Sequence, residues 1–420
     1  MLTPRGARRG PGAGAALGVL VLVLASVGGA RARAQAPTGD AHALTTAQVL
    51  RLADERAPDV SVAEAQASVA QSEVGVAGIL PTPRIGGGVS VDYAGILDLF
   101  VQLPIFGQLD TATDAARARA QLASASIDVA RLDARLAAVL AWTDLWLAER
   151  LATLASDEAA RRERLEEIAT AREAEGTASH LDVIRASADA ARARAEDEAQ
   201  ARVVRAAAAR LAGAIGEAPG ERALTTGGDP LTGGDPESET EAAARLEAHP
   251  LVARADDGVE AADAAAVHEH RSRWPRLGIQ VSDWIHRAND AHDVRVMLTM
   301  DLALFDEPRI GRADAVRAQA RVEADAVRTR LRAGIASARE DLAATQSRCA
   351  AQEAEVLPRA REAADLARAG YEEGSVDLTT TLAAAQALAD AERALAGCWA
   401  DRARAAARHA HAEGRTDDWP

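Results

Sequence analysis

The side chains best suited to binding a metal ion stand in two short histidine motifs, His268-Glu269-His270 and His409-Ala410-His411. Imidazole and carboxylate groups are common ligands of transition metals. Residues two apart on a helix point to different faces, however, so neither motif places its two imidazoles together. We interpret both as solvated helix faces and predict no metal site and no cofactor. No other set of polar residues converges, and we do not expect an enzyme.

The two cysteines, Cys349 and Cys398, lie at almost equal distances on the two sides of Gly374. If the chain reverses direction at that glycine, their thiols face each other across an antiparallel pair of helices. A disulfide requires Cα atoms within about 7 Å and persists in exported proteins. Two buried free thiols are the alternative. We predict the disulfide.

The first 34 residues are typical of a secretory signal peptide, with early arginines, an apolar run from Ala13 to Val27 and small residues at Ala32 and Ala34. No later stretch approaches the roughly 18 apolar residues of a membrane-spanning helix. If the exported chain enters a membrane, we expect it to do so as a closed β-barrel. A formal net charge of −15 argues against nucleic-acid binding.

The remaining chain is an internal duplication. Ala57-Pro58 recurs as His249-Pro250, Pro83-Arg84 as Pro275-Arg276, and Glu175-Gly176-Thr177 as Glu373-Gly374-Ser375. A period of about 190 residues indicates two copies of a domain and not a solenoid repeat. We predict a first repeat over 35–224, a linker over 225–238 rich in glycine, proline and threonine, a second repeat over 239–414 and a tail over 415–420.

Each repeat contains two segments in which apolar and polar residues alternate, at about 84–106 and about 276–305. The clearest is the run from Asp293 to Leu304, in which Val294, Val296 and Leu298 alternate with polar or less apolar residues. Segments of about ten residues with this alternation are typical of membrane barrel strands. Four strands are too few to close a barrel around a lumen, so several copies must share one.

Between the strands and the glycines run very long segments rich in Ala, Arg, Glu and Leu, from about 110 to 173 and from about 311 to 372. Their composition predicts helices, with Pro358 as a possible kink. Gly176 and Gly374 end these helices, and returning helices are expected over 181–214 and 380–412. Shorter helices are expected over 46–80 and 239–273.

The order of helix, strand pair, long helix, tip and returning helix, given twice after a signal peptide, resembles the TolC family of outer-membrane efflux channels. The tip sequences that carry the resemblance are Glu175-Gly176-Thr177 through Asp182 and Tyr371 through Gly374-Ser375. The junction Leu304-Phe305-Asp306 is also similar to that of the CzcC-like heavy-metal branch.

The resemblance implies a mainly helical fold with a membrane β-barrel. Three chains would share a 12-stranded barrel in the outer membrane and a barrel of long antiparallel helices in the periplasm. The tips Gly176, Thr177, Gly374 and Ser375 would then meet a periplasmic adaptor bound to an inner-membrane pump of the RND or ABC type. Asp182 and Tyr371 match the gating positions of TolC and are our gating candidates. We expect a gating hydrogen bond between them; the alternative is that Asp182 only favours the N-terminus of its own helix.

The tips also depart from TolC. Val376 stands where TolC has an arginine in the second tip, and Thr380 and Ala383 stand where its ring of aspartates lies. The resemblance therefore predicts a less ionic gate and no cation-binding ring. A periplasmic adaptor or coiled-coil scaffold is the alternative function, which explains the helices but not the four alternating segments.

Overall fold

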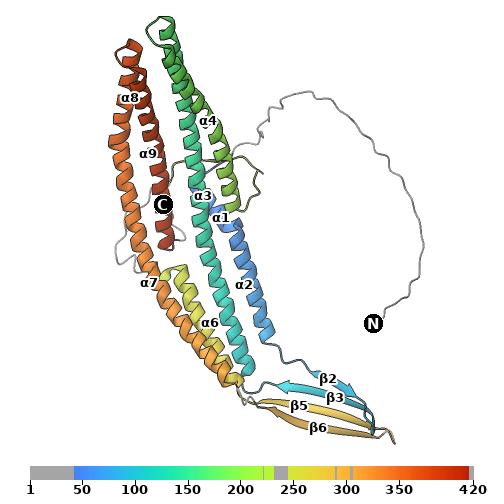
Figure 1. Ribbon diagram of the computed structural model, residues 1–420. Coiled ribbons are helices and arrows are strands. Elements are labelled where there is room, and N and C mark those ends of the chain that lie inside the picture. Colours follow the sequence, from blue (N-terminus) through green and yellow to red (C-terminus); the bar gives the residue numbers. More distant parts are fainter. Residues whose placement is uncertain (1–41, 221, 231–244, 289–290, 303–305, 416–420) are drawn as a thin grey trace, which may run out of the picture. The chain divides into compact units, whose positions relative to one another are not determined.

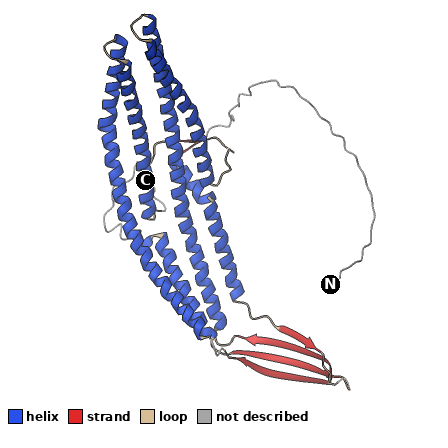
Figure 2. Ribbon diagram, viewed as in Figure 1, coloured by secondary structure: helices blue, strands red, loops and turns tan. Residues whose placement is uncertain are grey.

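A computed structural model describes residues 42–220, 222–230, 245–288, 291–302 and 306–415. These residues belong to one compact unit, Asp40–Pro420. The expected signal peptide and most of the expected linker and tail lie outside the described residues. Long helices run side by side through this unit, and four strands form a sheet beside their ends (Figures 1 and 2).

The first repeat contains helices α1 (Thr46–Arg56), α2 (Pro58–Ala77), α3 (Gln108–Ala174) and α4 (His180–Ala214). The single helix expected over 46–80 is thus two helices. The break falls at Ala57, which is extended with φ −57° and ψ 134°. Pro58 is the cause, because a proline disfavours helical dihedrals in the residue before it. With 67 residues, α3 is roughly 100 Å long.

The second repeat contains α6 (Pro250–Ser272), α7 (Glu307–Ala351), α8 (Leu357–Glu373) and α9 (Leu378–Ala412). The long helix expected over 311–372 is divided by a π-helical turn, η1 (Gln352–Val356). Pro358 follows directly in the first turn of α8. Its ring lacks an N–H and collides with the carbonyl four residues earlier, so the preceding turn widens.

The four strands between the helices form one antiparallel sheet in the order β2 (Arg84–Gly88), β3 (Tyr93–Leu103), β5 (Arg276–His286) and β6 (His292–Asp301). The central pair, β3 and β5, joins the two repeats. The first strand is shorter than its alternation suggested, since it ends at Gly88 and leaves Val89 and Val91 outside it. The outer edges of β2 and β6 have no partner strand among the described residues.

The two faces of the sheet differ in chemistry. One face carries exposed apolar side chains, among them Ile85, Val296 and Leu298, which are 76%, 71% and 73% exposed. On the other face Asp98 accepts hydrogen bonds from Ser282 and Gln280 across the strands. Alternation therefore separates an apolar face from a polar one, as a barrel wall between lipid and a wet lumen requires.

A second, small sheet pairs β1 (His42–Leu44) with β4 (Leu224–Thr226) in parallel. Sequence analysis did not predict either strand, and β4 occupies the first two residues of the expected linker. The fully buried Trp142 of α3 donates its Nε1–H to the carbonyl of Leu44 over 2.6 Å. The surrounding core is built largely from alanines, with Val49, Leu211 and Ile215 as larger members.

Candidate functional site at the helical tips

The first tip joins α3 to α4 through a left-handed glycine and a capping box. Gly176 has φ +74°, and the N–H groups of Thr177 and Ala178 donate to the carbonyl of Arg172. The Ser179 hydroxyl then accepts from the Asp182 N–H at 3.2 Å, while the Asp182 carboxylate accepts from the Ser179 N–H at 3.1 Å. These N–H groups of the turn and of the helix N-terminus are thereby satisfied locally.

The second tip repeats this design between α8 and α9. Gly374 has φ +79°, and the N–H groups of Ser375 and Val376 donate to the carbonyl of Gly370. Asp377 caps α9 by accepting from the Thr380 N–H at 2.9 Å. This hydrogen bond lowers the pKa of the Asp377 carboxyl. The two tips are therefore chemically alike although their sequences differ.

Arg172 joins the two tips. Its Nη1 donates to the carbonyl of Tyr371 over 2.6 Å, and its guanidinium lies over the Tyr371 ring, 4.7 Å from the centroid. Its Nη2 also donates to the carbonyl of Thr177 at 3.2 Å. One side chain thus holds the first tip turn to the last turn of α8. Sequence reasoning did not single out this residue, because every basic residue of the chain is an arginine.

Tyr371 lies beneath this contact in a small apolar cluster that all four tip helices supply. The residue is 2% exposed and packs against Leu165, Ala169, Ala186 and Leu378. Its hydroxyl makes no hydrogen bond to any residue that the structure describes. Burial raises the pKa of Tyr371, Arg172 opposes the shift, and Asp182 adds to it.

The two gating candidates lie near each other without a direct hydrogen bond between them within the described chain. The Asp182 carboxylate is engaged by its own helix terminus, where the Ser179 hydroxyl also donates to it at 2.8 Å. Thr380, which stands at a TolC aspartate position, donates its hydroxyl to Asp377 at 2.8 Å and completes the cap of α9. The structure thus places Asp182 and Thr380 in helix caps and Tyr371 in the contact between the tips.

Below the tips, a charged network connects α3 with α9. Arg162 and Glu158 of α3 are 4% and 5% exposed and form an ion pair at 2.6 Å. Gln386 and Glu392 are the partners on α9. Arg162 donates to the Gln386 amide oxygen at 3.3 Å, and Arg161 forms an ion pair with Glu392 at 2.8 Å. Moving α9 away from α3 would leave buried charges without their partners, which is strongly destabilising. These contacts therefore hold α9 against α3.

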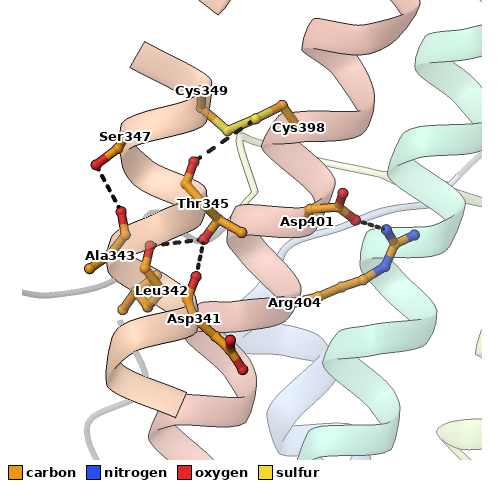
Figure 3. Close-up of a disulfide and its surroundings, with 9 residues drawn as sticks. All are labelled: Asp341, Leu342, Ala343, Thr345, Ser347, Cys349, Cys398, Asp401 and Arg404. Carbon is orange, nitrogen blue, oxygen red and sulfur yellow. Dashed lines mark hydrogen bonds and ion pairs between the residues drawn. A yellow bond between two sulfur atoms is a disulfide. The ribbon is translucent and has the colours of Figure 1, made fainter. Parts of the chain in front are cut away.

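The structure joins Cys349 of α7 and Cys398 of α9 in a disulfide, with 5.5 Å between the Cα atoms (Figure 3). The sulfur of Cys398 also lies 4.0 Å from the carbonyl of Thr345. The bridge ties the returning helix to the helix beside it. It belongs to the framework that carries the tips and takes no part in the tip contacts themselves.

The histidine motifs do not gather ligands. His268 contacts the hydroxyl of Thr111 at 3.1 Å, whereas His270 contacts the carboxylate of Asp314 at 3.1 Å. Burial lowers the pKa of His268. Among the described residues, no three His, Cys, Asp or Glu side chains are arranged to hold a metal ion. No described helix combines the length and the apolar character that crossing a bilayer would need.

Comparison with known proteins finds a family that resembles part of this chain. Residues 49–217 match the family model described as outer membrane efflux protein. No curated protein sequence matches the chain.

Several solved structures share the fold. A membrane protein from Pseudomonas aeruginosa superposes with a TM-score of 0.75 at 19% identity, covering 88% of this chain and 93% of that one. The outer membrane protein VceC from Vibrio cholerae gives 0.71 at 19% identity over 88% and 96% of the two chains. The CmeC outer membrane channel from Campylobacter jejuni gives 0.74 at 13% identity over 88% and 85%. Residues 49–217 therefore resemble the outer membrane efflux protein family, and the chain shares its fold with solved proteins of the outer membrane.

Proposed function

We propose that three copies of this chain form a passive exit duct through the outer membrane and the periplasm. The observation that carries the proposal is the four-stranded sheet with two unpaired edges, set at the end of long helices. An unpaired strand edge invites another strand, and β6 of one copy can pair with β2 of the next. Three such sheets supply the 12 strands of one shared barrel.

The faces of the sheet support the same arrangement. The apolar face that carries Ile85 and Leu298 would meet lipid, and the polar face around Asp98 would line the lumen. The helices would continue the lumen into the periplasm. We assign the duct no catalytic activity, so an energised partner must drive the transport.

The tips Gly176, Thr177, Gly374 and Ser375 form the periplasmic end of the proposed duct. We propose that a periplasmic adaptor docks there and connects the duct to an inner-membrane pump of the RND or ABC type. The CzcC-like heavy-metal branch stays a prediction, since the junction residues Leu304 and Phe305 lie outside the described residues.

We further propose that the contact between the tips is the resting gate. Asp182 and Tyr371 remain the gating candidates of the sequence, and Arg172 is the residue through which Tyr371 is held. Opening would then require the Arg172 guanidinium to leave the Tyr371 carbonyl and ring.

The test is planar-bilayer recording of the purified exported chain, preceded by chemical cross-linking in detergent. We expect a cross-linked trimer and discrete channels of one conductance class. A monomer that is released from outer membranes by salt or carbonate and forms no channels would refute the duct. That result would favour the alternative, a periplasmic adaptor or scaffold.

A further inference from the structure

The same joint occurs once in each repeat, where a returning helix ends against the start of a shorter helix. In the first repeat, Gly216 at the end of α4 contacts the backbone of Arg56, directly before Ala57 and Pro58. In the second repeat, Gly414 at the end of α9 packs against His249 and Pro250. Both glycines are left-handed, with φ +73° and +67°.

The two joints differ in the residue that begins the shorter helix. Ala57 begins α2 without any side-chain cap. His249 begins α6 and caps it, because its Nδ1 accepts the N–H of Leu251 over 3.0 Å. The duplication therefore supplies the same joint with and without an imidazole cap.

The hydrogen bonds of His249 define one protonation state. An N–H can only donate, so the Nδ1 that accepts from Leu251 must be unprotonated. Its Nε2 lies 3.3 Å from the carbonyl of His411 in α9, and a carbonyl can only accept, so Nε2 carries the proton. His249 is 1% exposed. The joint between α9 and α6 therefore depends on a neutral, buried imidazole.

Other charged groups face this imidazole from the neighbouring helices. The His411 side chain contacts Asp133 of α3 at 2.7 Å. At the end of α9, Glu413 is 4% exposed and lies 3.3 Å from His409 and 2.6 Å from Arg415. No carboxylate in this set hydrogen-bonds to His249 itself, so a proton added to its Nδ1 would face the Leu251 N–H and the positive end of α6.

We propose that the joint between α9 and α6 is an acid-sensitive hinge, which loosens when His249 gains a second proton and loses its hydrogen bond from Leu251. The matching joint at Ala57 has no imidazole cap and stays insensitive to acid. The hinge gives the second repeat a response to pH that the first repeat lacks. This inference does not depend on the proposed trimeric duct.

The electrostatic environment supports the direction of the effect. Burial lowers the pKa of His249 below its usual value, the hydrogen bond to the His411 carbonyl opposes this shift, and the charges of His411 and Asp133 act in opposite directions. The pKa of an exposed histidine is about 6.5. When the pKa is lower in the closed joint, the neutral histidine stabilises the joint fully above pH 6.5, and this stabilising free energy is lost as the pH falls. Between pH 7.5 and 5.5 the opening equilibrium should therefore rise, with about tenfold as the upper limit for one proton.

Amide hydrogen exchange of the full exported chain in detergent tests this inference. After correction for intrinsic exchange rates, the peptide over 250–256 should open more at pH 5.5 than at pH 7.5, by at most about tenfold. The peptide over 58–64 is the internal control and should not change. Equal changes at the two joints, or no change at either, would overturn the proposal.

Two variants assign the effect to the proposed atom. His249→Asn supplies an uncharged N-cap oxygen and should keep α6 capped while removing the pH dependence. His411→Asn removes the contact to Asp133 but keeps the carbonyl, so the pH dependence should remain. A pH response that survives His249→Asn would contradict the assignment.

Exchange of the imidazole C2 hydrogen, followed by mass spectrometry on the unmodified protein, gives the His249 pKa without any variant. A value at or above the usual 6.5 would refute the hinge even if His249→Asn failed to fold. A value below it, together with the differential amide exchange, would support the hinge.

Discussion

Replacing Arg172 by alanine should weaken the closed state of the proposed duct. Among the described residues, only Arg172 donates a hydrogen bond from the first tip to the Tyr371 carbonyl. Its guanidinium also lies over the Tyr371 ring. Alanine removes both contacts together with the side-chain hydrogen bonds to Thr177, and it leaves the backbone hydrogen bonds of the tip turn in place. The perturbation thus acts on the link between the tips.

The expected magnitude follows from these two contacts. A hydrogen bond to a charged group contributes about 1.5 to 3 kcal/mol, and an exposed cation–π contact contributes about 0.5 to 1 kcal/mol. Because Arg172 is half-buried, solvent screens part of both contributions. We therefore expect a loss of about 2 kcal/mol per chain, which corresponds to a roughly 30-fold larger ratio of open to closed states for each tip contact, and this factor multiplies if the three contacts of a trimer open together.

Single-channel recording in planar bilayers measures that ratio directly. Arg172→Lys should lie between wild type and Arg172→Ala, because an ammonium keeps the charge but lacks the planar fork. The control is Arg164→Ala, which removes an exposed arginine of the same helix that makes no ion pair or hydrogen bond with a described residue.

An open-to-closed ratio that is unchanged in Arg172→Ala, or changed equally in Arg164→Ala, would refute the reasoning. Circular dichroism and trimer cross-linking should be the same in all three variants. If they are not, the change in gating cannot be assigned to the tip contact.

Three further predictions concern the framework around the tips. Cys349→Ser should lower the free energy of unfolding by about 4 kcal/mol, because the bond to Cys398 closes a separation of 49 residues; reduction of the wild type should have the same effect in denaturant titrations. Tyr93→Phe leaves Tyr371 as the only tyrosine, and its phenolate absorbance should then appear with a midpoint above pH 10, because burial raises its pKa. The free energy of unfolding should fall as the pH rises through that range. A midpoint at or below pH 10 would contradict the burial of Tyr371. Gly374→Ala should cost about 1 to 2 kcal/mol in thermal or chemical unfolding because φ is +79°, and an unchanged stability would show that the turn relaxes.

Much of the architecture could be predicted because it depends on periodic patterns. Alternation predicted the four strands of the sheet, and long runs of helix-forming residues between glycines predicted the helical hairpins. The near-equal distances of Cys349 and Cys398 from Gly374 predicted that these residues face each other, and the structure brings them together.

Features that depend on a few atoms could not be predicted in the same way. The strands β1 and β4 have three residues each, too few for alternation to be recognised. The role of Arg172 arises from its position against a carbonyl almost 200 residues later in the chain. Only the break at Ala57 had a visible signal, since Pro58 disfavours a continuous helix.

The pairing of β1 with β4 has a consequence for the order in which the chain acquires its structure. These strands enclose the first repeat, so its small parallel sheet can form as soon as residue 226 is available. The larger sheet cannot be completed before β5 is available. The separation of β3 and β5 along the chain is similar to that of β1 and β4. Until β5 is available, the β2–β3 hairpin therefore has an unpaired inner strand, and such a strand edge is prone to aggregation.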